Sequence, residues 1–125
     1  MAKLNNILKE IEQQIPGFVS ISVVGTDGLS IAVNCASDFD YETANAQFAL
    51  VMKLLQKTAG QLGKKSFDDY LVTTEHAYLL TRFVGDGSYW FGIAIDRNAG
   101  TLGNMRLVAR QYADKIWSSI PKKRK

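Results

Sequence analysis

Cysteine and histidine are almost absent from this chain of 125 residues, which contains one of each, Cys35 and His76. A single cysteine cannot form an internal disulfide, and one cysteine with one histidine cannot build the usual Cys/His zinc cage. We therefore expect no metal site, no redox-active cysteine pair and no other cofactor.

Long apolar runs are also missing. Runs such as residues 89–95 are far shorter than the roughly 20 residues that a membrane-spanning helix requires, and the first residues lack the apolar segment of a secretory signal. We expect no integral membrane association and a cytoplasmic location. The length, with 46% apolar and 22% charged residues, is typical of one globular domain, which we assign to residues 1–121.

Basic residues are concentrated at one place in the chain. The formal net charge is +3, and Lys122, Lys123, Arg124 and Lys125 supply four positive charges. Subtracting these four charges leaves −1 for residues 1–121, whereas nucleic-acid-binding domains usually carry a basic surface. We expect no nucleic-acid partner. For residues 122–125, here called the basic tail, a solvated segment is favoured over an anchor to nucleic acid or to an anionic membrane.

Apolar spacing and turn residues predict eight elements in the order αββαβββα. Residues 89–95 are apolar on both faces, which is typical of a central strand. Asp38 and Asp40 are candidate N-caps for the second helix. The predicted helices cover residues 4–15, 41–62 and 102–116, and the predicted strands cover residues 18–24, 29–34, 67–74, 78–84 and 89–95.

The helix predicted over residues 41–62 has apolar residues on two sides. At about 100° per residue, Ala46, Leu50 and Leu54 lie opposite the main apolar face. A helix on the sheet of a monomer needs only one such face, so the second stripe indicates a partner surface, although chance exposure of two leucines is an alternative. The main face consists of Tyr41, Ala44, Phe48, Met52, Leu55, Ala59 and Leu62.

Groups with catalytic potential have no evident partners. Asp68 and Asp69 are adjacent on a predicted strand and should point to opposite faces, so they cannot serve one substrate together. His76 falls in a predicted turn, where an exposed imidazole is expected, and no base is evident near Cys35. We therefore predict that the protein is not an enzyme.

Two glycine-containing segments, residues 25–28 and 85–87, are interpreted as hairpin turns rather than ligand-binding loops. Neither has the Gly-Lys-Ser/Thr ending of a phosphate-binding loop, so this chain should not itself bind GTP or ATP. Arg106 and Arg110 are four residues apart on the last helix and follow Arg97. They are candidates for binding an acidic partner, with a solvated helix flank as the alternative.

The order of several short motifs resembles the Roadblock family, which includes dynein light chains and MglB-like bacterial regulators of Ras-like GTPases. The motifs are Pro16-Gly17-Phe18, the segment Thr26-Asp27-Gly28-Leu29-Ser30-Ile31-Ala32, Tyr78-Leu79-Leu80, and the loop and helix start from Asp96 to Arg106. The resemblance covers residues 15–120. The basic tail is not part of it.

The resemblance implies an α+β fold, a three-layer α/β/α sandwich around a five-stranded antiparallel sheet in the order 2-1-5-4-3, which is Roadblock/profilin-like. It also implies a homodimer that joins the second helix (Ala46, Leu50, Leu54) and the third strand (Tyr70) of two copies. The expected function is that of a non-enzymatic adaptor or regulator that binds a small Ras-like GTPase and modulates its nucleotide cycle or its localisation. The alternative is a PAS-like ligand sensor with a pocket lined by Tyr89, Trp90 and Phe91.

Overall fold

The computed structural model describes residues 2–36, 41–63 and 68–121, and shows an antiparallel sheet of five strands in the order β2-β1-β5-β4-β3. Both the eight-element order and the strand order expected from the sequence are confirmed. The elements are α1 (Ala2–Gln14), β1 (Phe18–Gly25), β2 (Ser30–Cys35), α2 (Tyr41–Gln61), β3 (Tyr70–Thr73), β4 (Ala77–Val84), β5 (Tyr89–Asp96) and α3 (Leu102–Ser119).

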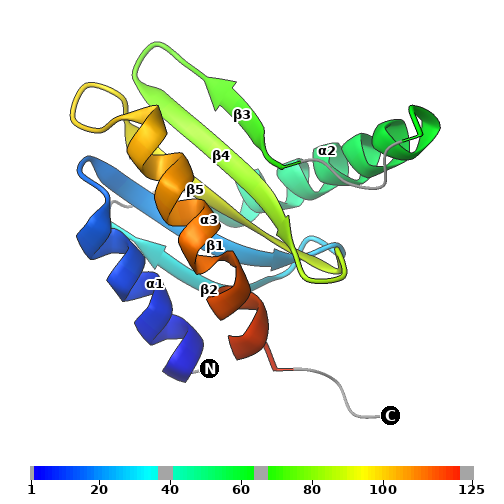
Figure 1. Ribbon diagram of the computed structural model, residues 1–125, viewed down its shortest axis with the longest axis horizontal. Coiled ribbons are helices and arrows are strands. Elements are labelled where there is room, and N and C mark those ends of the chain that lie inside the picture. Colours follow the sequence, from blue (N-terminus) through cyan, green and yellow to red (C-terminus); the bar gives the residue numbers. More distant parts are fainter. Residues whose placement is uncertain (1, 37–40, 64–67, 122–125) are drawn as a thin grey trace.

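The sheet is the middle of three layers. Helices α1 and α3 cover one face side by side, and α2 lies on the other face (Figure 1). This arrangement is the predicted α+β sandwich. The basic tail and the proposed N-caps Asp38 and Asp40 lie outside the described residues, so their predicted roles are not addressed by the structure.

The larger part of the core lies between the sheet and the helices α1 and α3. Leu4, Leu8 and Ile11 recur at intervals of three and four residues, so they line one side of α1, and all three are fully buried. Met105 and Ile116 bring α3 into the same cluster. Burial of each such side chain contributes about 1.5–3 kcal/mol.

Strand β5 is central, as its two apolar faces predicted. It pairs with β1 on one side and with β4 on the other. Successive side chains on a strand point to opposite faces, so Phe91 joins the α1–α3 core while Trp90 joins a smaller cluster with Val24, Ala49 and Met52 beneath α2.

Both glycine-containing turns are hairpin turns, as predicted. Gly28 and Gly85 adopt φ values of +88° and +56°, which a residue with a Cβ rarely adopts. The turn between β1 and β2 is closed by the Gly28 amide, which donates to the Gly25 carbonyl at 2.9 Å.

Two details of the prediction are wrong. Helical periodicity places Leu62 on the core face of the second helix, but its side chain is 72% exposed, because the C-terminal part of α2 extends beyond the sheet (Figure 1). The third strand begins at Tyr70 rather than at residue 67, which lies outside the described residues. The periodicity also does not reveal the buried polar residue on α2. Asn45 is 7% exposed, and its amide donates to the Ser30 hydroxyl at 2.9 Å.

Within the described ranges, none of the three helices combines the length and the apolar composition that crossing a membrane requires.

Candidate functional site

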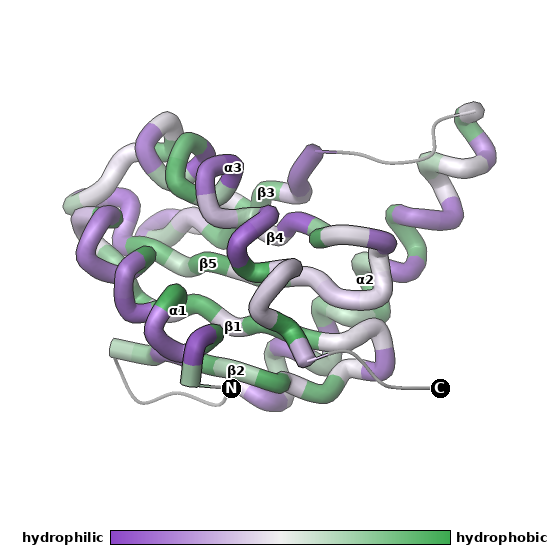
Figure 2. Tube along the Cα trace, turned by 60° about the horizontal axis from the view of Figure 1, so that its bottom comes forward, coloured by the Kyte–Doolittle hydropathy of each residue, from purple (hydrophilic) through white to green (hydrophobic). Residues whose placement is uncertain are grey.

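The outer side of α2 carries an exposed apolar stripe. Leu50 and Leu54 are 69% and 63% exposed, and Ala46 precedes Leu50 by four residues, one helical turn away. We call these three residues the α2 stripe. In Figure 2 hydrophobic segments recur along α2 to its projecting end, where Leu62 is also exposed. Neighbouring exposed apolar side chains of this kind are typical of a surface that another protein covers.

Strand β3 is a sheet edge beside α2. It pairs with β4 from Tyr70 to Thr73 and with no other described strand. Tyr70 is half-buried and packs against the small cluster that contains Met52 of α2. An edge strand has backbone N–H and C=O groups available for pairing with another strand. The structure therefore brings Tyr70 close to the sheet-facing side of α2.

An apolar pocket of about 300 Å³ lies between the N-terminal half of α2 and the sheet. The sheet side of the pocket is lined by small residues, Ser20, Ser22, Gly92 and Ala94, which leave space beneath α2. Along β1 and β5 these small residues alternate with larger residues that point to the other face of the sheet. That alternation is visible in the sequence and could have indicated the hollow.

Trp90 lines this apolar pocket, whereas the other two aromatic residues of the sensor alternative do not. Phe91 is buried in the α1–α3 core, and Tyr89 lines a different hollow. The shared aromatic pocket expected for a PAS-like sensor is therefore not formed. The Trp90 indole Nε1 is buried without a hydrogen-bond partner among the described residues.

Arg106, one of the three candidate partner-binding arginines, is held by Asp69. The guanidinium donates from Nε to Oδ2 and from Nη2 to Oδ1, both at 3.0 Å. The hydrogen bonds that the guanidinium donates to Asp69, and then the negative charge of Asp69, raise the pKa of Arg106 above its ordinary value. This bidentate geometry is the stronger form of an Arg–carboxylate contact.

Arg110 lies one turn further along α3 and approaches Asp68, with Nη2 and Oδ2 3.9 Å apart. Because β3 starts only at Tyr70, both aspartates interact with α3, and the prediction that they face opposite sides is wrong. Arg97 lies elsewhere, in the loop after β5. It donates to the Thr74 carbonyl at 2.8 Å and stacks over the Tyr78 ring. The structure thus places Arg106 and Arg110 together and Arg97 apart from them.

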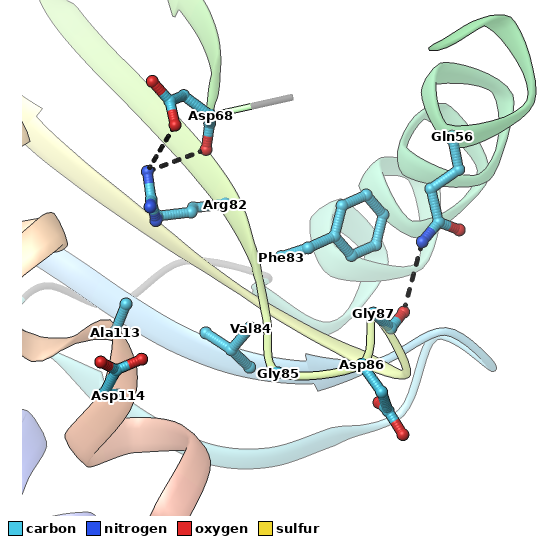
Figure 3. Close-up of a pocket in the computed structure, with 10 residues that line it drawn as sticks. All are labelled: Gln56, Asp68, Arg82, Phe83, Val84, Gly85, Asp86, Gly87, Ala113 and Asp114. Carbon is cyan, nitrogen blue, oxygen red and sulfur yellow. Dashed lines mark hydrogen bonds and ion pairs between the residues drawn. The ribbon is translucent and has the colours of Figure 1, made fainter. Parts of the chain in front are cut away.

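A second pocket, of about 360 Å³, is polar and lies beside the end of β4. Figure 3 shows Arg82 directed toward Asp68, whose carbonyl and carboxylate oxygens lie 3.1 and 3.7 Å from Nη1, and Gln56 of α2 donating to the Gly87 carbonyl. The described lining contains no serine, cysteine, histidine or lysine. Its charged side chains are Arg82 and the carboxylates of Asp68, Asp86 and Asp114.

The histidine and the cysteine lie apart from these pockets. His76 is exposed in the β3–β4 turn, as predicted, with Nε2 3.6 Å from the Glu75 carboxylate. Cys35 is half-buried at the end of β2. Among the residues that the structure places, no three His, Cys, Asp or Glu side chains are grouped to hold a metal ion.

No protein-family model matches the chain. Among curated proteins, the chain is similar to the uncharacterized protein MJ0310 of Methanocaldococcus jannaschii, with 26% identity over 113 residues that cover 90% of this chain and 96% of the relative.

Solved structures identify the fold. MglB of Myxococcus xanthus superimposes with a TM-score of 0.84, at 19% identity, over 98% of this chain and 92% of that chain. A Roadblock/LC7 domain from Streptomyces avermitilis superimposes with a TM-score of 0.71, at 14% identity, over 90% and 97%. The chain therefore has the Roadblock/LC7 fold, and the resemblance inferred from the sequence is confirmed at the level of the fold.

Proposed function

We propose that this protein is a non-enzymatic regulator that forms a homodimer through α2 and β3 and binds a small Ras-like GTPase. The observation that carries the proposal is the α2 stripe, which is exposed on a helix whose opposite side already packs on the sheet. The likeness to MglB supports the regulatory role.

The dimer follows from where the apolar surface lies. In a twofold interface the same patch occurs on both copies, so burying Leu50 and Leu54 removes four leucines from water. Each fully buried leucine contributes about 1.5–3 kcal/mol. Pairing of the two β3 edges would satisfy backbone groups that one chain leaves to solvent, and Tyr70 would lie at that junction.

The GTPase partner is proposed from the likeness to MglB, because the Roadblock resemblance implies regulation of Ras-like GTPases. The glycine-containing turns of this chain are hairpins without a phosphate-binding sequence, so nucleotide would arrive with the partner. Loops of such GTPases become ordered around the γ-phosphate. We therefore expect one nucleotide state to be preferred, with Arg97, Arg106 and Arg110 as candidate contacts for acidic residues.

Affinity capture from a native lysate, followed by mass spectrometry, tests the partner. A small GTPase should be among the captured proteins. Purified GTPase loaded with a GTP analogue or with GDP should then bind to different extents. Absence of any GTPase would contradict the functional proposal, and equal binding of both forms would contradict state preference alone.

A further inference from the structure

A hollow of about 600 Å³ opens at the end of the sheet opposite Arg97, where the β1–β2 turn, the β4–β5 turn and the last part of α3 meet. We call it the Trp117 hollow. Neither the proposed dimer nor the proposed GTPase contacts use it. Its lining includes Asp27, Leu29, Ile31, Asp86, Tyr89 and Trp117.

The walls of the Trp117 hollow are fixed to one another. The Thr26 amide of the first turn donates to the Ser88 carbonyl of the second at 3.1 Å. Gly85 lies directly under the indole of Trp117, and a Cβ at this position would overlap the ring. The glycine therefore allows α3 to pack closely on the β4–β5 turn.

The lining combines the two features that receive a lysine or arginine side chain. Leu29 is 68% exposed and, with Ile31, offers apolar surface to an aliphatic stem. Tyr89 and Trp117 offer aromatic rings to a cation.

The two carboxylates of the hollow are fixed in position by their own turns. Asp27 accepts from the Leu29 amide and Asp86 from the Ser88 amide, each through Oδ1 at 3.0 Å. No described lysine or arginine forms an ion pair with Asp27. The hollow therefore matches a cationic side chain in both shape and charge.

We propose that the basic tail of the same chain docks in the Trp117 hollow and places a lysine or arginine side chain there. Ile120 is 3% exposed and belongs to the main core cluster, so the chain is still fixed to the domain one residue before Pro121. The tail starts five residues after Trp117. Four residues can span up to about 14 Å when extended, and Trp117 itself lines the hollow.

Charge favours the same occupant. The four basic residues of the tail follow a domain with a formal charge of −1. A segment of the same chain is present at a high effective concentration, so weak contacts are sufficient to keep it bound.

Two-dimensional amide NMR of the whole chain tests the proposal. In one variant all four tail residues are replaced by glutamine, and in the matched control Lys53→Gln and Lys57→Gln neutralise exposed lysines of α2. The tail variant should shift the Trp117 indole signal and the amides of Asp27, Leu29 and Tyr89, and the control should not. Unchanged signals from the distant strand β3 show that the variant is folded.

High salt and substitution of the two lining aspartates provide two further tests of the same contact. At about 1 M salt, where the Debye length is about 3 Å, the spectra of wild type and tail variant should coincide at the hollow. Asp27→Asn combined with Asp86→Asn should reproduce the Trp117 shift of the tail variant. Absence of any change at the hollow when the tail is neutralised would overturn the proposal.

A mixing experiment identifies the source of the tail. Unlabelled wild-type protein is added to the isotope-labelled tail variant. Hollow signals that stay at the positions of the tail variant support docking within one chain. Signals that move toward the wild-type positions would show binding between copies and would overturn docking within one chain.

Discussion

Arg106 of α3 and Asp69 are joined by two parallel hydrogen bonds of 3.0 Å, which link α3 to the residue immediately before the edge strand β3. The Asp69 side chain is only 11% exposed, so few water molecules can replace the guanidinium. This pair connects the edge strand expected in a dimer interface with the helix that carries candidate partner-binding arginines. Nothing in the sequence indicated that these two regions are in contact.

Replacement of Arg106 should therefore destabilise the fold more than replacement of Arg110. Arg106→Gln leaves a largely buried carboxylate without its main partner, whereas Arg110 makes one long contact, 3.9 Å, with the exposed side chain of Asp68. Exposed ion pairs contribute little. Thermal unfolding followed by circular dichroism should give a clearly lower melting temperature for Arg106→Gln than for Arg110→Gln. Equal melting temperatures would contradict a stabilising role for the pair.

The stabilisation by this pair should persist at alkaline pH. Asp69 raises the pKa of Arg106 in the folded state, so the stabilisation is fully present below the ordinary pKa of an unfolded arginine, which is itself strongly alkaline. It is lost only as pH rises through the still higher pKa of the folded state. The difference in melting temperature between wild type and Arg106→Gln should thus be the same at pH 7 and at about pH 10. A difference that shrinks over this interval would point to another titrating group.

The α2 stripe makes a prediction about assembly. Leu50→Glu places a charge in the proposed apolar interface and should convert the dimer into a folded monomer, as measured by light scattering. Leu107→Glu on α3 is the matched control, because Leu107 is also exposed, at 53%, but lies on the opposite face of the sheet. Exposed substitutions usually change stability by less than about 0.5 kcal/mol, so both variants should remain folded. A dimeric Leu50→Glu variant would exclude α2 from the interface.

Most of the fold could be predicted from local patterns. The spacing of Leu4, Leu8 and Ile11 indicated α1, and the two apolar faces around Trp90 and Phe91 indicated the central strand. The side chain of Leu62 could not be placed correctly, because helical periodicity shows which residues share a face but not where the sheet beneath them ends.

The candidate site was predictable only in part. The α2 stripe was visible in the sequence as a second set of apolar residues at helical spacing, on the side of the helix opposite the main apolar face. The pairing of Arg106 with Asp69 was not, because it joins residues 37 positions apart and depends on where β3 begins. The apolar pocket beneath α2 could have been predicted, because small residues alternate along β1 and β5 and the expected strand order already placed these two strands side by side.

Trp90 should be a structural residue. It is 1% exposed and packs edge-on against Phe48, with ring centroids 6.5 Å apart. Trp90→Ala should cost about 3–5 kcal/mol of unfolding free energy, which corresponds to a decrease in melting temperature of roughly 10–20 °C. Trp90→Phe keeps an aromatic ring and removes the unpartnered indole N–H, so it should cost much less. A Trp90→Ala variant with near-normal stability would instead favour a ligand-binding role in the apolar pocket.

The roles of Arg97 and Arg106 can be distinguished by measuring, for each variant, both GTPase capture and the melting temperature. Arg97 is exposed, and its side chain contacts the neighbouring β3–β4 turn through the Thr74 carbonyl and the ring of Tyr78 in β4. If it contacts the partner, Arg97→Glu should weaken capture while the melting temperature stays near that of wild type, and the loss should shrink at high salt because exposed charges are screened.

Arg106→Glu should reduce both capture and melting temperature, since it breaks the pair with Asp69. The charge swap Arg106→Asp with Asp69→Arg separates the two effects, because it restores an ion pair between the start of β3 and α3 but displaces the positive charge. Recovery of the melting temperature without recovery of capture would identify Arg106 as a partner contact. Recovery of both would show that Arg106 acts only by holding β3 against α3, and would remove it from the proposed partner-binding set.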